Sequence, residues 1–150
     1  MPSPNSRETY SYSYREWEFP TLGFVLEAHE AVINSSGGSH GVENDGYLES
    51  ALSAPLDSVF GDDAYQGLFD KTAALCFRLA KNHGFIDGNK RTALIAAEET
   101  LSWNGHEPRW TQESRVLVMS LVGAGFLDQA GLRHALAFGY GFHQAERTIP

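Results

Sequence analysis

Residues 81–94 read KNHGFIDGNKRTAL and join two apolar segments that have helical periodicity. A histidine comes first, a glycine interrupts the pattern, and an Asp, a second Gly, an Asn, a Lys and an Arg follow at once. A turn between two helices needs only a capping residue and a glycine. This stretch therefore carries more chemical groups than a turn requires, and those groups are candidates for a functional site.

Apolar residues recur at spacings of three and four on both sides of this stretch, which predicts a helix on each side. The upstream helix is expected over about residues 62–82, with Asp62 or Asp63 as its cap. His83 takes the next position of its apolar stripe. The downstream helix is expected over residues 89–103, where alanines leave one side thin enough for close helix packing.

The segment before these helices is divided by a long glycine-rich loop. Helical periodicity begins near Thr21, and NSSGGSHGVENDG at residues 34–46 ends it, because closely spaced glycines do not sustain a helix. Asp45 is a plausible cap for a short helix that Pro55 ends. Residues 1–14 are rich in Ser, Tyr and Pro without periodicity, so they are expected to form a flexible tail.

The segment after these helices predicts two more, over residues 113–125 and 129–139. No alternating strand pattern is convincing, although EPRW at residues 107–110 or part of the glycine-rich loop has room for a short hairpin. The predicted fold class is therefore all-α, with one domain over residues 15–150.

Composition limits the class of protein. The chain has 150 residues, of which 42% are hydrophobic, and a net charge of −8. That charge argues against a general surface for nucleic acid or anionic membranes, which requires clustered cations. The polar start and the lack of a long apolar segment favour a cytoplasmic protein without a membrane span. Cys76 lies in an apolar run with no evident base beside it, which favours a buried thiol over a nucleophile.

The start of the downstream helix has the features of an anion site. Amide N–H groups at a helix start point outward and carry partial positive charge, and Gly88 lets an anion approach the backbone closely. Lys90 and Arg91 add positive charge, and a guanidinium can hold phosphate oxygens with a fork of donors. The pattern indicates phosphate binding.

Asp87 and His83 add a candidate metal ligand and a candidate base to this anion site. A carboxylate beside an anion site is explained by Mg²⁺, which takes one or two carboxylates together with phosphate oxygens. The histidine has an ordinary pKa of about 6.5, which suits a base that accepts a proton from a hydroxyl. Base, metal carboxylate, amides and cations together indicate phosphoryl or nucleotidyl transfer. Each residue alone also has a structural interpretation, as a buried histidine, a helix cap or a solvated cation.

HGFIDGNKRTAL at residues 83–94 resembles the signature of the Fic/Doc (Fido) family, H-x-F-x-[DE]-G-N-[GK]-R, and NKRTA is typical of its Doc branch. The similarity extends over about residues 20–140. It implies a helical Fido fold with a glycine-rich flap over residues 37–46. It also implies a toxin of the death-on-curing type that uses ATP and Mg²⁺, modifies a target protein and is neutralised by an antitoxin protein.

The resemblance also assigns roles to single residues. It makes His83 the base and Lys90 a second catalytic residue, Phe85 an anchor of the loop and Asp87 the magnesium ligand. Phosphate contacts are assigned to the helix start and its neighbours: Gly88, Asn89, Lys90, Arg91 and, less directly, Lys81.

Two departures from the AMP-transferring members bear on the reaction. Those members have Gly where this chain has Lys90, and a second Arg where it has Leu94. In the Doc branch this Lys accompanies transfer of the terminal phosphate to a threonine of elongation factor Tu. The resemblance therefore favours a kinase, with AMP transfer or an inactive binding module as alternatives.

SHGVEN at residues 39–44 also fits the inhibitory motif of many Fic proteins, in which a glutamate blocks ATP. That motif lies on a helix, whereas Gly37, Gly38 and Gly41 predict a loop here. Regulation by a separate antitoxin is favoured over inhibition by Glu43.

Overall fold

The computed structural model describes residues 2–140, so Met1 and residues 141–150 of the expected domain lie outside it. Its regular elements are the helices α1 (Leu22–Ser36), α2 (Asp45–Leu52), η1 (Ala54–Leu56), α3 (Leu68–Lys81), α4 (Asn89–Trp103), α5 (Gln112–Gly123) and α6 (Gln129–Phe138), and the strands β1 (Ser11–Tyr14), β2 (Trp17–Pro20), β3 (Ser58–Val59) and β4 (Asp62–Asp63). Over these residues the prediction of a helical fold is confirmed.

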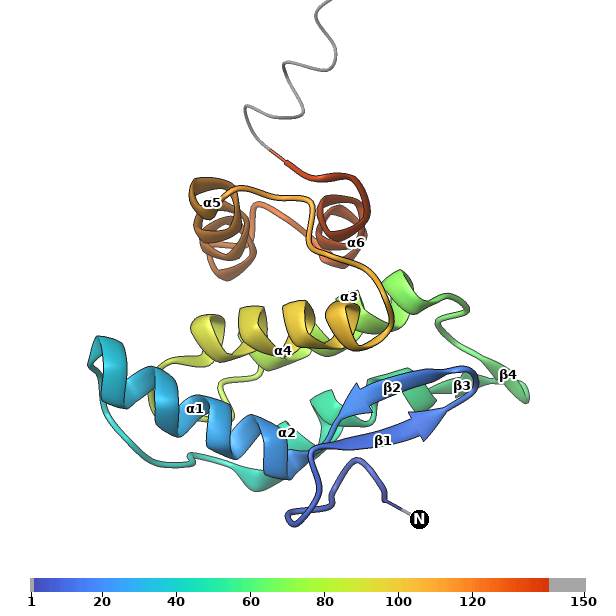
Figure 1. Cartoon of the computed structure of the whole chain (residues 1–150), viewed down its shortest axis with the longest axis horizontal. Coiled ribbons are helices and arrows are strands. Elements are labelled where there is room, and N and C mark those ends of the chain that lie inside the picture. Colours follow the sequence, from blue (N-terminus) through green and yellow to red (C-terminus); the bar gives the residue numbers. More distant parts are fainter. Residues whose placement is uncertain (1, 141–150) are drawn as a thin grey trace, which may run out of the picture.

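Helices α3 and α4 form the centre of the molecule and pack against each other (Figure 1). α1 and α2 lie on one side of this pair, and α5 and α6 lie on the other. The core between these layers is formed by buried leucines, valines and alanines, and the alanines of α4 allow the close approach expected from the sequence. Cys76 is fully buried in this core, and burial raises the pKa of its thiol to about 12. The prediction of a buried thiol is confirmed.

Helix starts differ in how their free N–H groups are satisfied. The side chains of Thr21, Asn44, Thr111 and Asp128 cap α1, α2, α5 and α6. By contrast, α3 and α4 begin after Gly67 and Gly88, which have no side chain to accept these hydrogen bonds. The cap predicted for the helix after the glycine-rich loop is therefore wrong by one residue, because Asn44 and not Asp45 takes that position.

The predicted start of α3 is also wrong. Asp62 and Asp63 do not cap a helix, because they form β4, which pairs with β3. Asp63 binds Arg15, which is 48 residues away in the sequence, and Lys71, which lies eight residues further on in α3. These partners hold residues 62–63 in a hairpin, and the helix begins only at Leu68.

The N-terminal segment is not the flexible tail that composition suggested. Residues 11–14 form β1, which pairs antiparallel with β2. Tyr12 is buried, and its hydroxyl donates to the carbonyl of Leu52 at 3.0 Å. Burial of this ring and of Phe19 holds the hairpin against the helices. EPRW forms no strand, and the glycine-rich loop makes one isolated bridge instead of a hairpin of its own.

Among residues 2–140, none of the helices has both the length and the apolar character needed to cross a bilayer.

Candidate active site

The loop between α3 and α4 places His83 at the surface. α3 ends at Lys81, and His83 has a φ of 55°, in the left-handed region. This conformation turns the chain away from the helix axis, so His83 is exposed and leaves the apolar stripe that it was predicted to continue. The imidazole is therefore accessible to a substrate, and the interpretation as a buried core histidine does not hold.

Phe85 and Asn89 give this loop its shape. Phe85 is 2% exposed, so its predicted role as an anchor is confirmed. Asn89 accepts from the Phe85 N–H and donates to the Phe85 carbonyl, both at 2.9 Å. Both polar atoms of the Asn89 side chain are thus used inside the loop. The side chain holds the loop closed, which differs from the expectation that it contacts phosphates.

The glycine-rich flap, residues 37–46, runs beside the loop between α3 and α4. The Gly84 carbonyl accepts from the N–H groups of Glu43 and Asn44, at 2.8 and 3.1 Å. One bridge pairs Val42 with Phe85. The flap is therefore attached to the loop through the backbone, and Glu43 lies outside any helix, as the glycines predicted.

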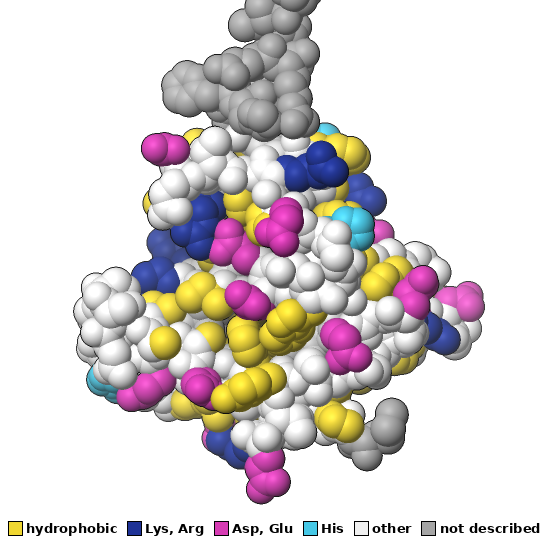
Figure 2. Space-filling model, viewed as in Figure 1, with side chains coloured by type: hydrophobic (Ala, Val, Ile, Leu, Met, Phe, Trp, Pro, Cys, Tyr) yellow, Lys and Arg dark blue, Asp and Glu magenta, His cyan; other side chains and the backbone are white. Residues whose placement is uncertain are grey.

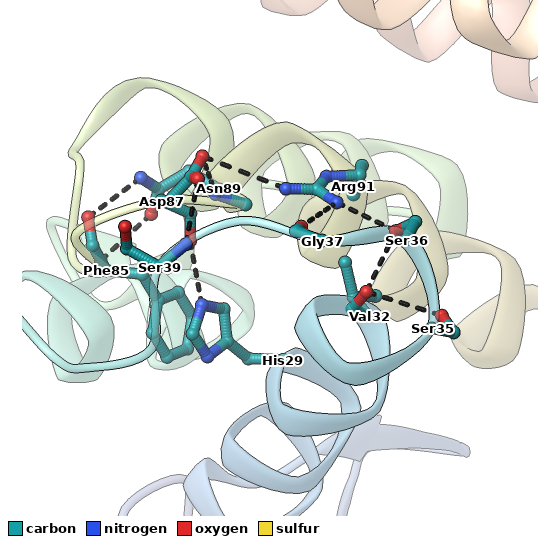
Figure 3. Close-up of polar contacts among 11 residues, drawn as sticks. His29, Val32, Ser35, Ser36, Gly37, Ser39, Phe85, Asp87, Asn89 and Arg91 are labelled. Carbon is teal, nitrogen blue, oxygen red and sulfur yellow. Dashed lines mark hydrogen bonds and ion pairs between the residues drawn. The ribbon is translucent and has the colours of Figure 1, made fainter.

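Asp87 is held by two backbone N–H groups (Figure 3). Its Oδ1 accepts from Gly88 N–H at 2.8 Å, and its Oδ2 accepts from Ser39 N–H of the flap at 3.1 Å. These two bonds, from Ser39 first and then Gly88, lower the pKa of the Asp87 carboxyl, and the charge of Arg91 adds to the effect. Asp87 is therefore an ionised carboxylate at neutral pH, and its side chain is 47% exposed.

Arg91 lies between Asp87 and the segment that follows α1. Its Nη1 donates to Ser36 Oγ and to the Gly37 carbonyl, both at 2.8 Å, and its Nη2 is 3.7 Å from Asp87 Oδ1. Gly38 lies so close that a Cβ there would be 2.5 Å from Asp87 Oδ2. Both the acidic and the basic side chain of the site therefore contact the first residues of the flap.

The first turn of α4 faces the same place. Gly88 has a φ of 81° and offers no side chain to cap the helix, which leaves backbone donors for a ligand. Lys90 is exposed and its side chain lies against Gly123 at the end of α5. The Lys81 ammonium donates to the carbonyls of Val122 and Gly123, at 3.3 and 3.4 Å. Lys81 therefore ties α3 to the end of α5 while it borders the site.

One pocket of about 380 Å³ brings these groups together. Every candidate site residue predicted from the sequence lines it: Lys81, His83, Asp87, Gly88, Asn89, Lys90 and Arg91. An exposed imidazole, an ionised carboxylate, an uncapped helix start and cations thus share one opening, which is an arrangement suited to transfer of a phosphate-containing group.

A second groove, of about 440 Å³, lies between α1 and α4, where hydrophobic side chains gather at the surface (Figure 2). Its charged lining residues are Glu27 and Glu99. Carboxylates repel phosphates, so this larger groove is less suited to a nucleotide than the pocket at His83.

Sequence reasoning missed two residues that contact Asp87. Ser39 acts through its backbone N–H, which no residue type reveals. His29 acts through its ring, whose Nε2 lies 2.7 Å from the Asp87 carbonyl. The position of His29 on the apolar face of α1 was the available signal, because a buried imidazole needs a hydrogen-bond partner.

Comparison with known proteins agrees with this geometry. The profile of the Fic/DOC family matches residues 19–101, and the chain belongs to that family. Proteins of this family are typically transferases that act on ATP.

Within the family, the chain is similar to Toxin Doc of Mycolicibacterium smegmatis (strain ATCC 700084 / mc(2)155), with 49% identity over 69 residues. The match covers 46% of this chain and 53% of that protein, so the chain spans about half the length of this relative.

Proposed function

We propose that the chain is a Doc-like toxin that transfers the terminal phosphate of ATP to a hydroxyl of a cytoplasmic protein. The observation that carries the proposal is the shared pocket of His83, Asp87 and the first turn of α4. The acceptor that we propose is a threonine of a translation factor such as elongation factor Tu, and the partner that neutralises the toxin is an antitoxin protein. The similarity to Toxin Doc supports this assignment.

In the proposed reaction His83 accepts the proton of the attacking hydroxyl. The hydroxyl oxygen forms a bond to the terminal phosphorus, the bond from that phosphorus to the bridging oxygen breaks, and ADP leaves. His83 is suited to this step because it is exposed at the pocket rather than buried in the core. The amides of α4 and the side chains of Lys90 and Arg91 hold the phosphates.

The residues at Asp87 fit a magnesium ion. The carboxylate is ionised, half exposed and beside the start of α4. Among residues 2–140, no group of three or more His, Cys, Asp or Glu side chains gathers around a metal position. A single carboxylate is sufficient for Mg²⁺ when the nucleotide supplies phosphate oxygens. Bound there, the ion would neutralise charge on the phosphates, with Asp87 as its protein ligand.

Transfer of the terminal phosphate is favoured over transfer of AMP by two side chains. Lys90 adds a long cation at the start of α4, where the AMP-transferring pattern has glycine. Leu94 is 7% exposed and packs inward, so the next turn of α4 presents no second guanidinium to the nucleotide.

The reaction is tested with ATP labelled at either phosphate. The purified protein is incubated with magnesium and elongation factor Tu, using ATP labelled at the terminal or at the α phosphate. We expect label on the target only from the terminal position, with a mass increase of one phosphate. Retention of the α label alone would reject the kinase and establish AMP transfer.

A helical binding module without activity is the remaining alternative. Under that alternative, His83→Ala leaves toxicity in growing cells unchanged. The enzyme requires that this substitution abolish toxicity while the protein still accumulates in the cell.

A further inference from the structure

His29 is a buried residue of α1 that contacts the loop of the candidate active site (Figure 3). Its side chain is 3% exposed, and its ring stacks on Phe85 with centroids 3.8 Å apart and planes 4° from parallel. Its Nε2 lies 2.7 Å from the carbonyl oxygen of Asp87. Because a carbonyl oxygen only accepts, Nε2 carries the hydrogen and donates it.

The bond to His29 fixes one end of the peptide unit between Asp87 and Gly88. The other end is the Gly88 N–H, which donates to Asp87 Oδ1 at 2.8 Å. In a trans peptide the C=O and the N–H point in opposite directions. With the oxygen held on the α1 side, the N–H therefore faces the Asp87 carboxylate, which lines the pocket.

Gly88 does not hold this peptide in one orientation by itself. Its φ of 81° and ψ of 16° are close to the values for the third residue of a type II turn. Glycine adopts positive and negative φ with similar ease, so the preceding peptide can rotate to the type I arrangement. After that rotation the Asp87 oxygen would face the carboxylate and the pocket, and it would repel phosphate.

We infer that His29 is a positioning residue for the active site. Its hydrogen bond to the Asp87 carbonyl keeps the peptide between Asp87 and Gly88 in the orientation in which the Gly88 N–H donates to the Asp87 carboxylate. The same bond orients the Asp87 carboxylate toward a magnesium-bound nucleotide. The ligand in this inference rests on the proposed function, whereas the orientation of the peptide does not.

Three variants separate this role from simple packing. His29→Phe keeps an aromatic ring against Phe85 and removes the donor. His29→Gln places an amide nitrogen near the position of Nε2 and restores the donor. Tyr12→Phe is the matched control, because it removes a buried hydrogen bond of similar kind, from the Tyr12 hydroxyl to the Leu52 carbonyl at 3.0 Å, away from the pocket.

The first measurement is the amide resonance of Gly88 in the ligand-free full chain by NMR. We expect one resonance in the wild type, in His29→Gln and in Tyr12→Phe, and a shifted or doubled resonance in His29→Phe. An unchanged Gly88 resonance in His29→Phe would overturn the inference, whatever the protein binds.

The second measurement is titration with Mg-ATP by calorimetry. We expect His29→Phe to bind about tenfold more weakly, the effect of losing one hydrogen bond, and His29→Gln and Tyr12→Phe to bind as the wild type does. Equal affinity of His29→Phe and the wild type would overturn the inference. If the wild type does not bind Mg-ATP, the proposed function fails, and the Gly88 resonance alone decides the role of His29.

Discussion

Asp63 and Asp87 both have a lowered carboxyl pKa, but the partners that lower it differ in kind. Asp63 is held by side chains: Arg15 contributes most, followed by Tyr14 and Lys71. Asp87 is held mainly by the backbone N–H groups of Ser39 and Gly88. The Asp63 side chain is 10% exposed, whereas that of Asp87 is 47% exposed.

This difference separates a structural carboxylate from one that can exchange partners. The ammonium of Lys71 is fully buried and donates to the Pro55 carbonyl and to Asp63, at 2.7 and 3.0 Å. That network joins the β1–β2 hairpin, the β3–β4 hairpin and α3. Asp87 instead lies at the opening of a pocket beside an exposed histidine, where a ligand can reach it. A lowered carboxylate pKa therefore indicates function only when the geometry leaves the group accessible.

The largest expected effect is the loss of catalysis when His83, which lines the same pocket as Asp87, is substituted. His83→Asn removes the imidazole that we propose as the base but keeps a residue that tolerates positive φ. We expect target modification to fall by about 10²- to 10⁴-fold without a change in melting temperature. A labelled-ATP assay measures the rate, with His106→Asn as a control. Near-normal activity of His83→Asn would show that His83 is not the base.

The matched pair Asp87→Asn and Asp63→Asn tests the comparison directly. We expect Asp87→Asn to lose magnesium-dependent binding of ATP and to unfold at nearly the same urea concentration as the wild type. Asp63→Asn should show the reverse, with lower stability and normal binding, because Lys71 would remain buried without its carboxylate. Calorimetry and urea unfolding measure the two properties, and loss of both in both variants would remove the distinction.

Lys71→Met tests whether the network around Asp63 stabilises the fold. Methionine keeps the buried volume, but the Pro55 carbonyl loses its donor and Asp63 loses one of three partners. We expect a loss of about 2–4 kcal/mol in the free energy of unfolding. Affinity for Mg-ATP should stay unchanged, since Lys71 is remote from the pocket. A stability equal to that of the wild type would show that the network is not structural.

Lowering the pH should reduce the stability contributed by both aspartates, and this effect is smaller than those of the substitutions above. Each has a folded pKa below the unfolded value of about 3.9. Each therefore contributes stability above that pH, and the contribution of Asp87 is small because its side chain is 47% exposed to solvent. The contribution is lost as the pH falls below about 4 toward the folded pKa. We expect Asp63→Asn to lose less stability than the wild type between pH 5 and pH 3. Parallel acid curves for the two proteins would contradict this.

Glu43→Gln should have the smallest effect. Glu43 lies in the flap and does not line the pocket, and its backbone N–H donates to the Gly84 carbonyl. We expect the rate of target modification to stay within about twofold of the wild type, a free-energy change of only a few tenths of a kcal/mol. A clear increase in rate would show that the glutamate obstructs the nucleotide.

The local part of the fold follows from the sequence, and the long-range part does not. The helix predicted over residues 89–103 has the bounds of α4, because Gly88 and the apolar periodicity are local signals. The predicted start of α3 was wrong because two side chains that bind Asp63, those of Tyr14 and Arg15, are distant in the chain. The β1–β2 hairpin was missed because its alternating pattern is short and its stability comes from burial of Tyr12 against other elements.

The same division holds for the site. Every site residue predicted from the motif lines one pocket, because these residues are close in sequence. Asn89 differed in detail, because its side chain forms two hydrogen bonds to Phe85 that no pattern of residue types reveals. His29 and Ser39 reach Asp87 from α1 and the flap, so only the fold identifies them.

A crystal structure of the protein with magnesium and a non-hydrolysable ATP analogue tests the shared pocket most directly. We expect the phosphates at the first amides of α4, between Lys90 and Arg91, with the terminal phosphate near His83. A nucleotide bound elsewhere, such as in the groove between α1 and α4, with the His83 pocket empty, would contradict the assignment.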